Sequence, residues 1–219
     1  MSNKSYDQTI GALNKTIDFL SIVPYAGFRV YESGEIPSEP VILAINHKLK
    51  VLVNPFLRDK DKRTRWIDHL FVGAKYPKKV HFMVQDIQYM KLATKRYLER
   101  LETFSSNKIR QGLRYLDNGE CVGIFPEGPA HLTEDRRMYW GIAWLSAHSK
   151  RKILPVYISK NSKDVNNVLH PKLNSLYIDY LTPLEPPKSC NKEDLEGKVN
   201  EFLGVFEGHK RFLYFNKKY

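Results

Sequence analysis

Short apolar runs alternate with longer amphipathic segments along most of the chain, and this alternation constrains the fold more than any other feature. Apolar runs of about four to eight residues are typical of buried strands, whereas the longer segments have helical periodicity. An alternation of this kind favours a single-domain α/β fold with a largely parallel central sheet flanked by helices. The expected strands are 40–46, 79–84, 121–125, 152–158 and 173–181.

Helices are expected between these strands. Ser105 or Ser106 is a good N-terminal cap for a helix that runs to Asp117, and Asn118-Gly119 is a typical helix end. Pro155 predicts an edge or irregular position for the fourth strand, because proline cannot donate to a ladder. The other expected helices are 65–75, 86–102, 136–149 and 192–207.

The chain is interpreted as an N-terminal amphipathic helical segment, 1–35, followed by the α/β domain, 36–219. Within residues 9–20, four apolar side chains recur at helical spacing, which fits either a helix packed on the core or a helix lying on lipid. Residues 48–64 interrupt the domain as an inserted loop that ends in the charge run RDKDKR. The four apolar residues are Ile10, Leu13, Ile17 and Leu20.

The charge balance favours an anionic partner. With 35 Lys and Arg against 24 Asp and Glu, the formal net charge is +11, which suits nucleic acid, an anionic membrane surface, or an acidic protein or substrate. No helix-turn-helix, zinc-finger or RNP signature is present, so nucleic acid is not expected. Two cysteines without metal-ligand spacing, Cys121 and Cys190, predict neither a metal site nor a disulfide framework. Since no run of apolar residues is long enough to span a bilayer, a cytoplasmic location is expected.

Two turns follow predicted strands at the edge where ligands bind. Asn46-His47 follows the first strand, and Phe125-Pro126-Glu127-Gly128 follows the third. In open α/β sheets, ligands bind at the carboxyl ends of the strands. A histidine there can act as a general base, especially when a carboxylate orients its ring. Asp68 is one candidate for that carboxylate, and Asp59, Asp61 and Asp86 compete with it.

Four segments, taken in order, resemble the glycerolipid acyltransferase superfamily, which includes lysophosphatidic acid and glycerol-3-phosphate acyltransferases. The resemblance covers roughly residues 38–160, and its order of strands, turns and helices implies the same α/β fold. The segments are VILAINHK at 41–48, VGIFPEGP at 122–129, YWGIAWLS at 139–146 and ILPVYI at 153–158.

The acid of the family motif is displaced in this chain. The family places an Asp five positions after the His, where this chain has Leu52. The segment WIDHLFVGAKYPKKVHFMV at 66–84 is similar to the family segment that begins at that Asp. On this alignment Asp68 is the motif acid, 21 positions after His47, with about 16 residues inserted. The alternative is a site that has lost its acid.

A second departure affects the acceptor. The family's Thr-Arg-Ser after Glu-Gly is replaced by Pro129-Ala130-His131, and the missing Arg is the residue that resemblance assigns to the acceptor's phosphate. Arg136 and Arg137 are the candidates to replace it, and Lys48, Lys50 or the inserted loop are alternatives.

The resemblance implies an acyltransferase that moves a fatty acyl group from acyl-CoA or acyl carrier protein to a lysophospholipid or glycerol phosphate. His47 and Asp68 would be catalytic, with no metal or bound cofactor. The protein is expected to act as a peripheral protein at the cytoplasmic face of a membrane, with an anionic membrane surface as partner. The alternatives are a different acceptor, or an inactive lipid- or protein-binding member of the fold. The residues expected to bind substrate are Asn46, Phe125, Pro126, Glu127, Gly128, Arg136 and Arg137.

Overall fold

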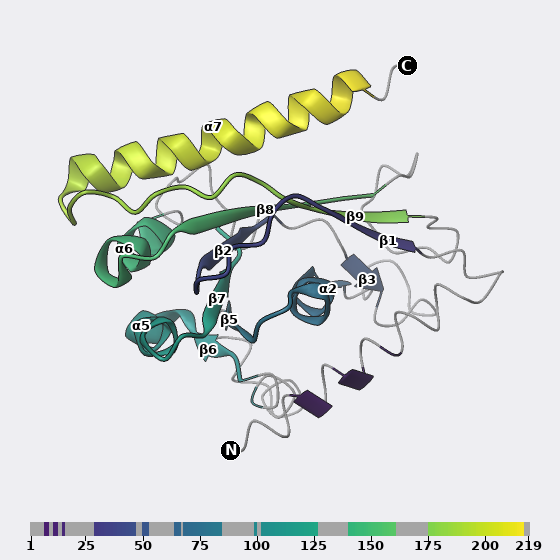
Figure 1. The fold of residues 1–219 in the computed structure, drawn as a ribbon, viewed down its shortest axis with the longest axis horizontal. Helices are drawn as coiled ribbons and strands as arrows, with labels where there is room; N and C mark the ends of the chain where they lie inside the picture. Colours follow the sequence, from purple (N-terminus) through teal and green to yellow (C-terminus); the bar gives the residue numbers. More distant parts are fainter. Residues whose placement is uncertain are drawn as a thin grey trace.

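A seven-stranded sheet forms the centre of the protein in the computed structural model (Figure 1). The structure describes residues 29–46, 50–52, 64–66, 68–84, 102–126, 140–160 and 175–216, and the single positions 7, 8, 11, 12, 15 and 99. The strand order is β1-β9-β8-β2-β7-β5-β6, and a separate two-stranded sheet pairs β3 with β4. The strands are β1 (Arg29–Ser33), β2 (Ile42–Ile45), β3 (Lys50–Leu52), β4 (Thr64–Trp66), β5 (Val80–Val84), β6 (Phe104–Ser105), β7 (Cys121–Ile124), β8 (Ile153–Lys160) and β9 (Ser175–Tyr180).

Most of the sheet is parallel, as the alternating pattern predicts. Strands β8, β2, β7, β5 and β6 pair with one another in parallel, and β9 pairs antiparallel with β8. The fold is therefore α/β, with a mostly parallel sheet flanked by helices. The helices are α2 (Asp68–Lys75), α5 (Ile109–Asp117), α6 (Trp140–Ser149) and α7 (Lys192–Asn216), and a short 3₁₀ turn, η2 (Ser106–Lys108), precedes α5.

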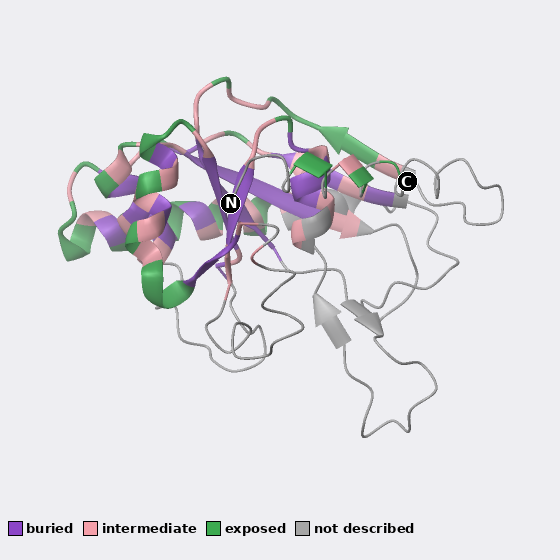
Figure 2. Ribbon diagram, turned by 90° about the horizontal axis from the view of Figure 1, so that it is seen from below, coloured by how far each residue is buried: buried purple, intermediate pink, exposed green. Residues whose placement is uncertain are grey.

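Both faces of the sheet are covered, which explains the nearly continuous apolar composition of β2. Leu43 and Ile45 belong to a core cluster shared with α2. Ile42 and Ala44 belong to the cluster on the other face, which receives side chains of α5, α6 and α7. Figure 2 shows the resulting band of buried residues along the central strands.

Pro155 lies in an interior strand, so the expectation of an edge position is wrong and that of an irregular position fits. Strand β8 lies between β9 and β2. The ladder with β9 begins at Val156, and an isolated bridge joins Ile153 to Leu184. Pro155 falls between them and contributes its carbonyl, which accepts a 2.9 Å hydrogen bond from the N–H of Leu181.

The helix expected from Ser105 or Ser106 to Asp117 is present as η2 followed by α5. Ser105 caps η2, whereas α5 itself begins at Ile109 after Lys108, which makes no side-chain cap bond. The Ser105 Oγ accepts a 3.2 Å hydrogen bond from the N–H of Asn107 at the start of η2. At the other end Gly119 has a φ of +80°, the left-handed conformation that glycine adopts without strain.

Several boundaries differ from the sequence prediction. Residues 64–66 form a strand, so the helix expected at 65–75 begins at Asp68. The inserted segment 48–64 is expected to be a loop, but its residues 50–52 form β3, which pairs antiparallel with β4 at the far end of the segment. Strands β1 and β6 were not expected, and α7 extends to Asn216.

Some expectations fall outside the described residues. These are most of the helix expected at 86–102, residues 136–139 of the next helix, and the apolar positions within 9–20. The described positions 7, 8, 11, 12 and 15 are helical. Within the part of the chain that the structure describes, no helix is both long and apolar enough to cross a membrane.

Candidate functional site

The two turns singled out in the sequence begin side by side at one edge of the sheet. Strands β2 and β7 are parallel neighbours, and Ala44 is in register with Ile124. Asn46 and Phe125 therefore leave the sheet together at its carboxyl edge. This is the edge at which open α/β sheets bind their ligands.

The buried side chain of Asn46 ties the end of β2 to β8. Its Nδ2 donates a 3.0 Å hydrogen bond to the carbonyl of Ile158, and its Oδ1 accepts a 2.6 Å hydrogen bond from the N–H of the same residue. The carboxamide of Asn46 therefore extends the β2–β8 ladder, because it exchanges two hydrogen bonds with the backbone of Ile158 as a strand residue would. Since Asn46 is only 2% exposed, this geometry gives it a role in holding the chain at the point where His47 follows. Substrate contact by Asn46 stays a prediction.

Asp68 begins helix α2 at the same edge. The connection from β2 to β5 joins two strands of the same direction, so α2 must run from the carboxyl edge back to the amino edge. Tyr76, just after the helix, lies in the buried cluster that contains Cys121, the first residue of β7. The backbone of Asp68 is described, whereas its side chain and the whole of His47 lie outside the described residues.

Aromatic contacts join the first turn of α2 to the turn after β7. The ring of His69 meets Phe82 of β5 edge-on, with centroids 5.9 Å apart and an interplanar angle of 67°. Phe82 in turn stacks with Phe125, at 6.2 Å and 25°. His69 is a titratable side chain at this edge that the sequence analysis missed. Its position directly after Asp68 is the signal that could have identified it.

The described part of the second turn is packed into the core. Phe125 is half-buried against the cluster that contains Phe82, and Pro126 is buried. The other residues expected to bind substrate, Glu127, Gly128, Arg136 and Arg137, lie outside the described residues. Their roles stay predictions.

A second group of charged side chains lies at the opposite, amino edge of the sheet. The Nε2 of buried His81 lies 3.0 Å from Glu120 Oε2, and its Nδ1 lies 2.9 Å from the carbonyl oxygen of Glu102. Lys79 pairs with both carboxylates, at 2.7 Å to Glu102 and 3.5 Å to Glu120. The ring of His81 lies flat on Tyr115, with centroids 3.6 Å apart.

Burial dominates the electrostatics of this amino-edge group. Burial lowers the pKa of His81 below its ordinary value. The hydrogen bond to the Glu102 carbonyl and the charge of the Glu120 carboxylate raise this pKa, but by less than burial lowers it. The group joins β5, β7 and the segment before β6. Because it is remote from the carboxyl edge, we assign it to the stability of the sheet.

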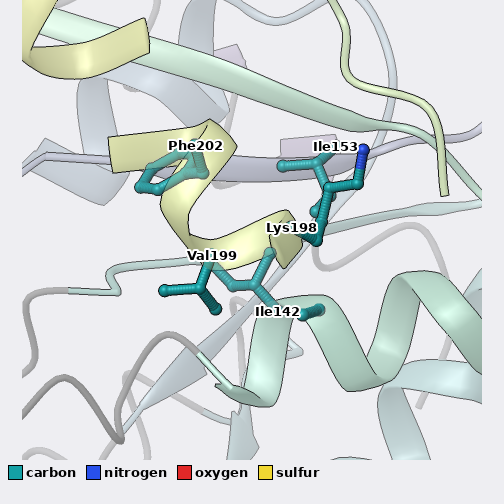
Figure 3. A pocket seen from close by; sticks show the side chains of 6 residues that line it. Ile142, Ile153, Lys198, Val199 and Phe202 are labelled. Carbon is teal, nitrogen blue, oxygen red and sulfur yellow. The ribbon is translucent and has the colours of Figure 1, made fainter. Parts of the chain in front are cut away.

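The described residues hold no cluster placed to bind a metal ion, and an apolar pocket among them lies away from the carboxyl edge. No group of three or more His, Cys, Asp or Glu side chains is placed to hold a metal ion in that part of the chain. A small apolar pocket lies between α6, β8 and α7, lined by Ile142, Ile153 and Phe202 among others (Figure 3). Ile153 begins β8, so this pocket is also away from the carboxyl edge.

Comparison with solved structures identifies a protein of similar fold. The structure is similar to the 1-acyl-sn-glycerophosphate (LPA) acyltransferase PlsC from Thermotoga maritima, with a TM-score of 0.56 and 15% sequence identity. The match covers 97% of this chain and 83% of the PlsC chain. At this identity the likeness establishes the fold. No protein-family model and no curated protein sequence matches the chain.

Proposed function

We propose that this protein is an acyltransferase that moves a fatty acyl group from an acyl thioester to a hydroxyl of a lysophospholipid or glycerol phosphate. The observation that carries the proposal is the meeting of three segments at one edge of a PlsC-like fold. These are Asn46 with His47 after it, Phe125-Pro126 with Glu127 after it, and the head of α2 at Asp68. They are the segments that resemble the family motifs in sequence.

In the proposed mechanism, His47 removes the proton of the acceptor hydroxyl while Asp68 orients the imidazole. The acceptor oxygen attacks the thioester carbonyl, and a tetrahedral oxyanion forms. When it collapses, the new ester C–O bond remains, the C–S bond breaks, and the proton passes from His47 to the departing thiolate. No residue of the protein becomes acylated in this sequence.

The acceptor is proposed from the turn after β7 and from the charge. Glu127 and Gly128 would shape the acceptor pocket, and Arg136 and Arg137 would meet the acceptor's phosphate. The net charge of +11 suits acidic acyl carrier protein, CoA and anionic membranes. Pro129-Ala130-His131 in place of the family's Thr-Arg-Ser favours, as a second candidate, an acceptor of a different kind.

The test is acyl transfer by the purified protein. Acyl-CoA is supplied with lysophosphatidic acid, other lysophospholipids or glycerol 3-phosphate, and the acylated product is measured by chromatography. Product is measured directly because Cys190 is exposed and would react with thiol reagents. We expect His47→Ala and Asp68→Asn each to lower kcat by at least about 100-fold, in line with the usual contribution of a general base.

Matched controls separate chemistry from folding. His148→Ala and Asp117→Asn replace exposed residues of α6 and α5 and should keep wild-type activity. Full activity of His47→Ala would refute the proposed base. If Asp68→Asn keeps full activity while His47→Ala is inactive, the result would instead favour a site that has lost the motif acid. No transfer to any acceptor by the wild type would favour the inactive, binding member of the fold.

A further inference from the structure

We propose that Phe82 is a positioning residue, which holds the head of α2 against the turn after β7 through its contacts with His69 and Phe125. The inference deepens the proposed function, on which it rests, by naming what sets the position of the motif acid. Phe82 touches neither substrate nor the reacting atoms in this account. It acts through Asp68, the residue that precedes His69.

The need for such a residue follows from the chain length between the two members of the dyad. In the family motif the acid follows the histidine by five positions, so the chain itself keeps the two together. Here 21 positions separate Asp68 from His47. The antiparallel pair β3–β4 closes this insertion, with Lys50 opposite Trp66, two positions before Asp68. The pairing brings the two ends of the insertion near each other, and the contacts of α2 with the main sheet then set where the helix begins relative to β7.

The aromatic contacts are placed to do this. Phe82 lies on β5, between the first turn of α2 and the end of β7. Its ring meets His69 at 5.9 Å and Phe125 at 6.2 Å. Phe82 is only 3% exposed, so the ring is confined on all sides by packed atoms. One rigid ring thus contacts both segments that flank the proposed site.

Gly123 makes room for this arrangement. It lies directly opposite Phe82 in the β5–β7 register. A Cβ at position 123 would lie 2.5 Å and 2.6 Å from two atoms of the Phe82 ring, and 3.1 Å from Val80. Any larger residue must therefore move the ring by about 1 Å to reach an ordinary contact distance. The absence of a side chain at Gly123 is what lets Phe82 lie across β7.

The test compares Gly123→Ala and Phe82→Leu with Gly112→Ala as a matched control. Gly112, in α5, is also crowded, since a Cβ there would lie 3.2 Å from Phe104, but it packs on the opposite face of the sheet. A displacement of about 1 Å can cost roughly 100-fold in rate. We expect Gly123→Ala to lower kcat by about that factor with little change in KM, and Gly112→Ala to remain within about threefold of wild type.

His69→Phe separates ring contact from proton transfer. Phenylalanine keeps an aromatic edge against Phe82 and cannot carry a proton. We expect this variant to keep activity within about threefold of wild type and to leave the pH profile of kcat unchanged. Loss of activity in His69→Phe alone would overturn the positioning account, because it would give the His69 imidazole a direct role.

Hydrogen exchange tests the positioning role of Phe82 without measuring acyl transfer, so its outcome does not depend on the proposed function. Hydrogen exchange of amides 72–76 reports the docking of α2, because the N–H of Tyr76 is bonded to the carbonyl of Val72 at 2.8 Å. Faster exchange there in Gly123→Ala and Phe82→Leu, with unchanged exchange in α6, supports the proposal even if no acyl transfer is found. Wild-type exchange in both variants refutes it. Equal losses of activity in Gly112→Ala and Gly123→Ala would also refute it.

Discussion

Acidification below about pH 6.5 is expected to destabilise the folded protein through one buried side chain, His81. Burial lowers the pKa of His81 below its ordinary value of 6.5, and the nearby Glu102 carbonyl and Glu120 carboxylate do not reverse the direction. The unfolded chain therefore binds a proton at a higher pH than the folded protein does. Between these two values the unfolded state holds more protons, and protonation favours it.

The change in stability due to His81 is confined to the pH range between its unfolded and folded pKa values. This contribution to stability is fully present above pH 6.5, the unfolded value, and is lost as the pH falls toward the lower folded value. Within that window one proton is taken up on unfolding. The free energy of unfolding should therefore fall by up to about 1.4 kcal/mol per pH unit because of His81 alone.

Urea unfolding between pH 8 and pH 5 measures the effect, with His81→Gln as the comparison. Glutamine cannot titrate, so the difference in slope between the two proteins isolates His81 from the carboxylates and the other histidines. His148→Gln, at the exposed end of α6, is the matched control for replacing a histidine by glutamine. Identical slopes for wild type and His81→Gln would refute the reasoning, as would an NMR signal of a charged His81 ring at pH 7.

Two further predictions concern the stability of the fold, one at a buried side chain and one at a strained backbone position. Asn46→Ala leaves the buried N–H and carbonyl of Ile158 unpaired and should cost about 2–4 kcal/mol in urea unfolding; a loss below about 0.5 kcal/mol would mean that water replaces both bonds. Lys150→Gly should stabilise the protein by about 0.5–1 kcal/mol, because Lys150, the residue after α6, has a φ of +56° and glycine adopts this conformation without strain. Thermal unfolding checks it, and an unchanged or lower Tm would contradict it.

Local patterns were sufficient for much of the fold. The apolar run at 41–45 is buried as strand β2, and the run at 121–124 is buried as β7, because a strand covered on both faces needs apolar side chains in both directions. The parallel direction of these strands follows from the helices between them. Their common direction places Asn46 and Phe125 at one edge, so the location of the candidate site was also predictable.

Other features depend on pairing between distant segments, which local patterns do not encode. Pro155 suggested an edge or irregular position and could not decide between them, and β8 lies inside the sheet because residues 175–184 return beside it. The carboxamide of Asn46 bonds to Ile158, 112 residues away in the chain, and no local pattern indicates this partner. Strand β6 was not predicted either, because its short pairing with β5 involves no apolar run in the sequence.

The sequence by itself determined the layered α/β architecture and the residue types at the carboxyl edge, because periodicity and turn chemistry act over a few neighbouring residues. Only the tertiary structure decided where α2 begins relative to that edge. That position depends on Phe82 lying across Gly123 and against His69. This packing forms only when α2, β5 and β7 are all in place, because the local sequence of one segment does not specify the positions of the other two.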